Sequence, residues 1–199
     1  MTTDSGQHRT LVLASTSPFR RELLQRLGVE FATMAPDVDE TRGQGESPEA
    51  LVLRLSEAKA RAGAERYPDA LIIGSDQVAV CGDEVLGKPG NHAAACRQLR
   101  RLAGQRVSFL TGLCLYDTAS DRARVELVPY QVVFRELTDR QIDRYLRIEQ
   151  PYNCAGSFKS EGLGISLFES MHGEDPNALI GLPLIRLTGW LNESGIEIP

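Results

Sequence analysis

The chain alternates between short apolar runs and segments with helical spacing. The runs at 10–14 and 71–73 consist of apolar, mostly branched side chains, which are typical of buried strands. Between them, Phe19, Leu23 and Leu27 recur on one face at the spacing of an amphipathic helix. The pattern therefore predicts strands joined by helices that each bury one face.

Capping signals give the helix boundaries. Ser17-Pro18 and Ser47-Pro48 each combine an N-cap residue with a proline at the first helical position. Thr138 and Gln141 have the spacing of a capping box. Helices are expected to begin after 17, 47, 91, 138 and 181 and to stop near 28, 67, 104, 151 and 195. The expected strands are 10–14, 29–35, 71–81, 85–86, 106–116, 124–135 and 163–168.

Two pairs of strands are expected to run antiparallel. Gly82-Asp83-Glu84 has the composition of a hairpin turn, so the strand that follows it returns along 71–81. This hairpin would bring Lys88 back to the neighbourhood of Asp76. The long runs 106–116 and 124–135 form the second pair.

Composition restricts the class of protein. The chain has 199 residues and a net charge of −5, which argues against a long nucleic-acid footprint. No apolar run is long enough to cross a bilayer, and residues 1–9 are polar, so a disordered tail followed by one domain over 10–199 is expected. The four cysteines form no CxxC motif, which favours a reduced, cytoplasmic protein.

The segment 71–78 is the first candidate site. A buried strand ends in Gly74, which permits close backbone approach, and Asp76 follows at once. A carboxylate at the end of a buried strand is costly unless it is paired, hydrogen-bonded or bound to a metal. Ligands of open α/β sheets bind outside such strand ends. Asp76 is therefore either a site residue or the cap of a turn.

Cations and acids elsewhere extend this candidate. Arg20 and Arg21 lie in the first turn of a helix, where they oppose the helix dipole, so a bound phosphate would explain them. Lys59 flanks a buried helix face and either extends to solvent or points into a cleft. The acids of 37–40 are suited to a divalent cation. The alternative for the arginines and for the acids is a solvated surface.

Five blocks resemble the Maf family of nucleotide pyrophosphatases and occur in the family's order over almost the whole chain. They are LASTSPFRR at 13–21, VDE at 38–40, SEAKA at 56–60, GSDQV at 74–78 and GKP at 87–89. The resemblance implies a two-lobed α/β fold around a long twisted mixed sheet with an interlobe cleft. It also implies metal-dependent hydrolysis of a nucleoside triphosphate to the monophosphate and pyrophosphate, and it suggests a homodimer.

The resemblance assigns roles to residues. Asp76 matches the family's general base, and Lys59 and Lys88 are catalytic candidates. Ser15, Arg20, Arg21 and Glu40 match further conserved polar positions. We expect Glu40 and Asp76 to hold a divalent cation, Mg, Mn or Co.

Three positions separate this chain from family members that act on thymidine or uridine nucleotides. Those members carry arginine in place of Phe19, threonine in place of Gln77 and glutamine in place of Glu161. The segment 156–162 resembles the subgroup that acts on 7-methyl-GTP. Phe19 could stack on the cationic methylated base, and Glu161 could accept from guanine N–H groups. Phe19 also fits a core position beside Leu23.

The expected function is therefore hydrolysis of 7-methyl-GTP, a small-molecule substrate, with no nucleic-acid or membrane partner. Water would attack the α-phosphorus while the basic side chains stabilise the phosphate charge. The alternatives are the same chemistry on a pyrimidine or other nucleotide, and a nucleotide-binding regulator of cell division without turnover.

Overall fold

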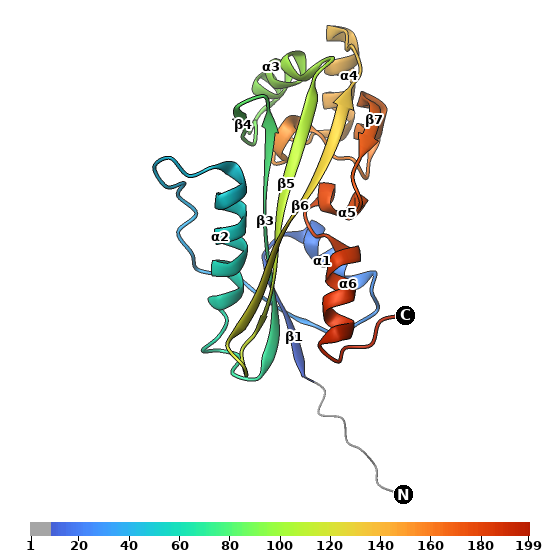
Figure 1. Ribbon diagram of the computed structural model, residues 1–199. Helices are drawn as coiled ribbons and strands as arrows, with labels where there is room; N and C mark the ends of the chain where they lie inside the picture. Colours follow the sequence, from blue (N-terminus) through green and yellow to red (C-terminus); the bar gives the residue numbers. More distant parts are fainter. Residues whose placement is uncertain (1–8) are drawn as a thin grey trace, which may run out of the picture.

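A seven-stranded mixed sheet runs through the computed structural model, which describes residues 9–199. The strands are β1 (Thr10–Ala14), β2 (Ala32–Met34), β3 (Ala70–Cys81), β4 (Glu84–Leu86), β5 (Arg106–Asp117), β6 (Arg122–Phe134) and β7 (Phe168–His172). Their order is β2-β1-β3-β5-β6-β7, and β4 pairs with β3 outside this path. Figure 1 shows the long strands β3, β5 and β6 running from a lower lobe into an upper lobe.

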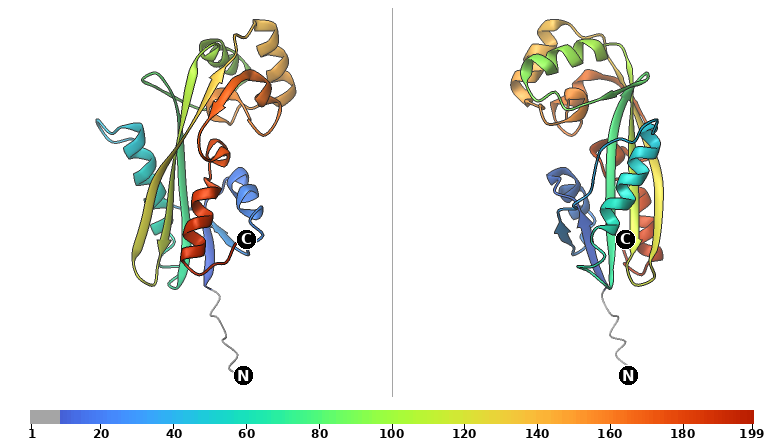
Figure 2. Two further views of the ribbon diagram at one scale, coloured as in Figure 1. Left: turned by 45° about the vertical axis from the view of Figure 1, so that its right-hand side comes forward. Right: turned by 90° about the vertical axis from the view of Figure 1, so that its left-hand side faces the viewer.

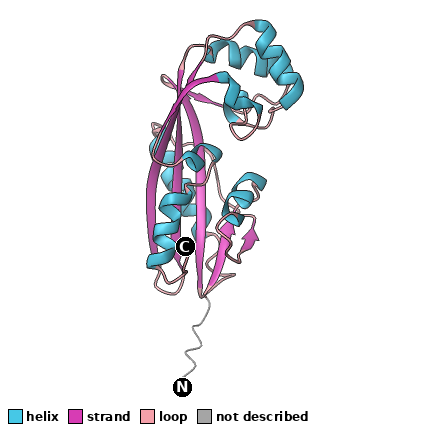
Figure 3. Cartoon of the chain, turned by 90° about the vertical axis from the view of Figure 1, so that its right-hand side faces the viewer, coloured by secondary structure: helices cyan, strands magenta, loops and turns pink. Residues whose placement is uncertain are grey.

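Helices cover both faces of this sheet. They are α1 (Pro18–Gln25), α2 (Pro48–Arg61), α3 (His92–Leu102), α4 (Asp139–Glu149), α5 (Pro176–Ile180) and α6 (Leu184–Glu193), with short 3-10 helices η1 (Ala155–Ser157) and η2 (Leu163–Leu167). In the lower lobe, α2 lies on one face of the sheet, and α1 and α6 lie on the other (Figures 1 and 2). The upper lobe carries α3 and α4 around the ends of the long strands (Figure 3).

The strand directions divide the sheet into two parts. β1 pairs in parallel with β2 on one side and with β3 on the other. β5, β6 and β7 continue the sheet as antiparallel neighbours. The expected two-lobed α/β fold on a mixed sheet is therefore confirmed, and the strand order, which the sequence left open, is now defined.

Three apolar clusters form the cores of the two lobes. In the lower lobe, the cluster between the sheet and helices α1 and α6 includes Leu13, Ile73 and Leu187. A smaller cluster, which includes Ile72 and Ala60, lies under α2. The upper lobe has its own cluster between the ends of β3, β5 and β6 and helices α3 and α4. We call the part of the sheet between the two lobes the waist. It lies between these apolar clusters, so buried polar groups can be placed there.

Most expected helix starts are confirmed, whereas α2 ends at Arg61, earlier than the expected end near 67. Ser17, Ser47, Asn91 and Thr138 cap their helices, and Thr138 with Gln141 forms the full capping box. The β3–β4 hairpin turns at Gly82, whose φ of 59° suits glycine. β5 and β6 pair in register over their whole lengths.

Near the C-terminus one expectation was wrong and one helix was not predicted. Residues 163–167 form the 3-10 helix η2 instead of a strand, and β7 begins only at Phe168. A tight turn explains the difference, because the amide of Gly164 donates to Lys159 O, and a Cβ at Gly164 would lie 2.2 Å from that oxygen. The helix α5 was missed, although Asp175 before Pro176 is an N-cap signal.

The N-terminal region differs in detail. The expected strand 29–35 is shortened to β2, residues 32–34. Residues 1–8 of the expected tail lie outside the described residues, whereas Arg9 binds Asp117 at the end of β5. Over residues 9–199, no helix combines the length and apolar character needed to span a membrane.

Candidate active site at the waist of the sheet

The site begins at an interruption on one edge of β3. β1 pairs with this edge up to Ile73, and β4 pairs with it from Ala79 onward. Among residues 9–199, no strand covers 74–78 on that side, whereas β5 pairs with the opposite edge throughout. β1 ends beside this interruption, which is the position where open α/β sheets bind ligands.

Two glycines bring α2 unusually close to the sheet here. A Cβ at Gly74 would lie 2.1 Å from Ser56 O, and one at Gly112 would lie 2.3 Å from Val52 O. The hydroxyl of Ser56 accepts the amide of Asp76 at 3.1 Å. Because α2 lies this close, a side chain one turn after Ser56 reaches β3.

That side chain is Lys59, which binds two carboxylates. Its Nζ lies 2.7 Å from Asp76 Oδ1 and 2.7 Å from Glu40 Oε1. Only 7% of the Lys59 side chain is exposed, and these two carboxylates offset the cost of burying its ammonium. Of the two readings of Lys59, the structure supports the one in which the ammonium points into a site.

Glu40 comes from the loop between β2 and α2. Arg54 of α2 holds this loop by donating to both carboxylate oxygens of Glu46, at 2.7 and 2.9 Å, and to Thr41 O at 3.1 Å. The hydrogen bond from Lys59, together with the charges of Arg20 and Lys88, lowers the pKa of Glu40. Glu40 is therefore an exposed anion that is paired with Lys59 and lies within the electrostatic reach of Arg20 and Lys88.

Arg20 approaches the same acids from α1. Its Nε donates to Gly181 O at 2.8 Å, and the hydroxyl of the N-cap residue Ser17 accepts its backbone amide at 3.4 Å. Burial lowers the pKa of Arg20, while the charges of Asp76 and Glu40 act in the opposite direction. An arginine remains protonated in such surroundings, so it supplies a fixed positive charge.

The backbone carbonyl oxygens of Ala178, Leu179 and Gly181 lie at the end of α5. We call this group of three acceptors the α5 bracket. Ser75 Oγ donates to Gly181 O at 2.9 Å, and Thr111 Oγ1 donates to Ala178 O at 2.8 Å. Alternation along β3 places Ser75 on the face opposite Asp76.

Gln77 also binds the α5 bracket. Its Nε2 lies 2.7 Å from Ala178 O, 3.2 Å from Leu179 O and 2.8 Å from Thr111 Oγ1. Carbonyl oxygens only accept, so this end of the amide must be the NH2 group. The expected specificity residue Gln77 therefore has its donors committed to α5.

The segment 153–162 is held firmly in the upper lobe. The ring of Phe158 makes edge-to-face contacts with Phe109, Phe134 and Phe168, at centroid distances of 4.8 to 5.7 Å. Glu161 follows on the exposed side of this anchored segment, and Ser160 Oγ donates to it at 3.3 Å. A carboxylate held in this way is available to a ligand.

The remaining predicted residues lie at different places. The hydroxyl of Ser15 accepts the amide of Ser17 at 3.1 Å, in the turn that leads into α1. Phe19 is half-buried and so not fully committed to the core. Arg21 is exposed and lines a groove beside β2 and the C-terminal tail, so the structure does not bring it to Lys59.

Sequence reasoning missed Arg54 and Thr111, and neither residue carries a motif that could have identified it. No three His, Cys, Asp or Glu side chains within residues 9–199 gather as a metal site. Glu40 and Asp76 nevertheless converge on one cation, Lys59 Nζ. Two carboxylates together with substrate phosphates are a ligand set that Mg²⁺ commonly uses, so the residues fit the expected cation.

Comparison with known proteins identifies the family of this chain. Residues 10–194 match the family described as Maf-like protein. The chain belongs to this family. The match includes every residue of the waist site and both lobes.

Several proteins named 7-methyl-GTP pyrophosphatase are similar to this Maf-like protein over nearly their full length. The one from Alcanivorax borkumensis is 58% identical, and the alignment covers 98% of this chain and 99% of the relative. Those from Nitrosococcus oceani and Pseudomonas aeruginosa are 58% and 56% identical, each over 95% of this chain and over 95% and 98% of the relative.

A solved structure supports the fold. The Staphylococcus aureus Ham1 protein superposes with a TM-score of 0.55 at 12% identity, covering 94% of this Maf-like protein and all of that chain. At this identity the likeness concerns architecture alone, and it confirms the expected two-lobed class of fold.

Proposed function

We propose that this Maf-like protein hydrolyses 7-methyl-GTP to 7-methyl-GMP and pyrophosphate, and so keeps a modified nucleotide out of nucleic acids. One observation carries the enzymatic part: Asp76 lies at an open strand edge, paired with the buried Lys59 and near the charges of Arg20 and Glu40. The names of the relatives support the substrate.

Asp76 is proposed to position the attacking water and to accept its proton. Its Oδ1 binds Lys59 Nζ at 2.7 Å, which fixes the direction of the carboxylate. General bases of this kind contribute about 100- to 10,000-fold to a rate. Lys59 thus keeps the base oriented while the water is activated.

The phosphate oxygens are proposed to meet Arg20 and Lys88. Arg20 uses its Nε on Gly181 O and retains its terminal nitrogens for a ligand. Lys88 is exposed, and its charge reaches Glu40, so it lies within the field of the site. Cations placed before the reaction stabilise the charge that develops as pyrophosphate leaves.

Glu40 and Asp76 are proposed to hold the divalent cation, since both carboxylates already converge on a positive charge. When bound, such a cation neutralises phosphate charge and polarises a phosphoryl oxygen. Lys59 would then share its carboxylate partners with the cation.

Base recognition is proposed to depend on Phe19 and Glu161. Methylation at N7 makes guanine cationic, and an aromatic face attracts such a ring by about 0.5–2 kcal/mol. Glu161 is exposed on the anchored segment 153–162, where it can accept from guanine N–H groups. Gln77 contributes by fixing the α5 bracket rather than through its donors.

Two other readings stay open to test. A pyrimidine or unmethylated nucleotide could be the substrate, and a regulator of cell division could bind a nucleotide without turnover. The cytoplasmic location, the homodimer and the absence of nucleic-acid and membrane partners stay predictions from the sequence.

A nucleotide panel tests the proposal. Pyrophosphate release is measured from 7-methyl-GTP, GTP, UTP and dTTP, with a divalent cation and with a chelator. We expect the highest kcat/KM for 7-methyl-GTP and loss of turnover with the chelator. Equal or higher kcat/KM for UTP or dTTP would contradict the substrate, and binding without turnover would favour the regulator.

Asp76→Asn tests the general base. The substitution keeps the size of the side chain and removes the basic oxygen, so kcat should fall at least about 100-fold while nucleotide binding stays measurable. Pyrophosphate release and binding by calorimetry are measured on the same preparation. An Asp76→Asn protein with kcat near the wild-type value would refute the assigned role.

A further inference from the structure

Gln98 of α3 bonds the segment that carries Lys88 and the segment that carries Glu161 at once. Its Nε2 donates to Gly87 O at 3.1 Å, and its Oε1 accepts from the hydroxyl of Ser157. Gly87 directly precedes the proposed phosphate ligand Lys88. Ser157 belongs to the segment that carries Glu161. We infer that Gln98 is a positioning residue that fixes the phosphate-binding and base-binding segments relative to each other.

The Ser157 contact is buried and conformationally demanding. Ser157 has no exposed surface, and its φ of 61° lies in the left-handed region that non-glycine residues seldom adopt. A backbone held in this region needs its neighbours to maintain it. The hydrogen bond to Gln98, together with the anchoring of Phe158, supplies that support.

The Gly87 contact acts on a segment that otherwise has few ties. Gly87, Lys88 and Gly90 are exposed, and the segment follows the short strand β4. One further bond joins the same two segments, since the amide of Gly90 donates to Tyr152 O at 2.8 Å. The two segments are therefore joined in two ways, by the side chain of Gln98 and by the backbone hydrogen bond of Gly90, two residues after Lys88.

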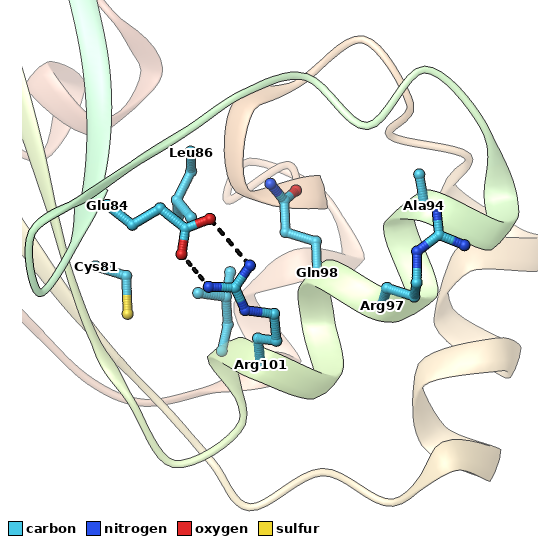
Figure 4. A pocket seen from close by; sticks show the side chains of 8 residues that line it. Cys81, Glu84, Leu86, Ala94, Arg97, Gln98 and Arg101 are labelled. Atoms are coloured by element: carbon cyan, nitrogen blue, oxygen red, sulfur yellow. Dashed lines mark hydrogen bonds and ion pairs between the residues drawn. The ribbon is translucent and has the colours of Figure 1, made fainter.

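The surroundings of Gln98 make this role separable from folding. Figure 4 shows Gln98 between Arg97 and Arg101 on α3, at the wall of a cavity of about 330 Å³. Apolar side chains of Leu86 and Leu102 also line this cavity. A leucine at position 98 would therefore meet apolar neighbours and open space instead of a packed core.

The two bonds can be removed one at a time. Gln98→Glu keeps an oxygen that accepts from Ser157, but it loses the donor to Gly87 O and places two acceptors face to face. Ser157→Ala removes the hydroxyl and leaves the Gly87 bond intact. Gln98→Leu removes both. Arg97→Gln is the matched control, because Arg97 is an exposed residue of the same helix and the same cavity.

Hydrogen exchange of the nucleotide-free protein tests the link directly, because local opening exposes amides. We expect exchange several-fold faster at 87–91 in Gln98→Glu, at 154–162 in Ser157→Ala, and at both in Gln98→Leu. Arg97→Gln should leave both segments unchanged. The inference would be overturned if both segments exchange at the wild-type rate in Gln98→Leu. If Gln98→Leu does not fold, wild-type exchange in Gln98→Glu and Ser157→Ala would overturn it.

The functional readout rests on the proposed function. Gln98→Glu should lower kcat about fivefold and keep the preference for 7-methyl-GTP over GTP. Ser157→Ala should lower that preference about fivefold and keep kcat within twofold. Gln98→Leu should do both, a scale that fits the loss of single hydrogen bonds. Equal losses on both nucleotides in all three variants would show a merely structural role and overturn the inference.

The two proposals fail differently. A wild-type protein that releases no pyrophosphate from any nucleotide would refute the proposed function, while the exchange pattern would still decide whether Gln98 links the segments. An active wild-type protein whose variants keep their kcat, preference and exchange would refute the role of Gln98 alone.

Discussion

Lys59 shows how much of the site depends on a single residue. The sequence places it beside the buried face of α2 and leaves its direction open. The structure turns its ammonium inward between Glu40 and Asp76, with 7% of the side chain exposed. A buried ammonium needs such partners. Because Glu40 and Asp76 bind the same ammonium, each acid helps to hold the other in position.

Phe19 provides a test at the same scale. Phe19→Arg should lower kcat/KM for 7-methyl-GTP about tenfold, because an arginine repels the cationic base and removes the aromatic face. GTP, whose base is uncharged, should lose less. Turnover of both nucleotides is measured for wild type and variant. Equal losses on the two would contradict the cation–π account and favour a packing role for Phe19.

At the scale of elements, the α5 bracket turns a short helix into a support for the site. Side chains from three elements, β3, β5 and α1, bind the carbonyl oxygens at its end, as shown by the bonds of Gln77, Thr111 and Arg20. A carbonyl oxygen has two lone pairs, so Ala178 O can accept the amide of Gly181 at 3.1 Å and these side chains as well. The direction of Arg20 therefore depends on where α5 ends.

Thr111→Val tests this support. The substitution keeps the shape but removes a buried hydroxyl that serves Gln77 and Ala178 O, so stability should fall by about 1–3 kcal/mol and kcat/KM several-fold. Thr111→Ser retains the hydroxyl and should restore kcat/KM. Denaturant unfolding and turnover are measured on both. A Thr111→Val protein with wild-type kcat/KM would show that the bracket does not position the site.

The lower end of the sheet offers a test by pH. Arg9 binds Asp117 and lowers its pKa to about 2 from an ordinary value of 3.8. A lowered pKa stabilises the fold above about pH 4, and this contribution is lost as the pH falls from 4 toward 2.

Asp117→Asn should therefore reduce the free energy of unfolding by about 1–2 kcal/mol at pH 7, after allowing for solvent screening. The difference from wild type should shrink between pH 4 and 2. Urea unfolding at several pH values measures it. A difference that is constant with pH would show that the ion pair does not contribute.

The elements also show what a sequence can predict. Caps and hairpin turns are local, so Ser17, Thr138 and the turn at Gly82 were identified correctly. The 3-10 helix η2 was mistaken for a strand because its shape depends on a bond from Gly164 to Lys159 O, which hydrophobic periodicity does not reveal. Asp76, Lys59 and Arg20 were candidates from the residue pattern, and the family resemblance assigned their roles. Gln98 and Thr111 act through contacts between distant segments and have no local signal.

At the scale of the whole molecule, three continuous strands join the lobes. β3, β5 and β6 pair without interruption across the waist, so the sheet passes beside the site instead of ending at it (Figure 3). A large hinge motion would break these hydrogen bonds. Adjustment to a nucleotide is therefore expected from the exposed side chains of Glu40, Lys88 and Glu161.

The close approach of α2 at Gly74 and Gly112 gives the fold a narrow tolerance. Glycine has no side chain beyond a hydrogen atom, so α2 and the sheet come very close at these two positions. Any larger residue there would push them apart. A widening of even one methyl group would draw the ammonium of Lys59 away from Asp76 and leave that carboxylate without its ion-pair partner. The spacing between the two backbones is therefore a condition for the contact between Lys59 and Asp76, alongside the identity of the two charged residues.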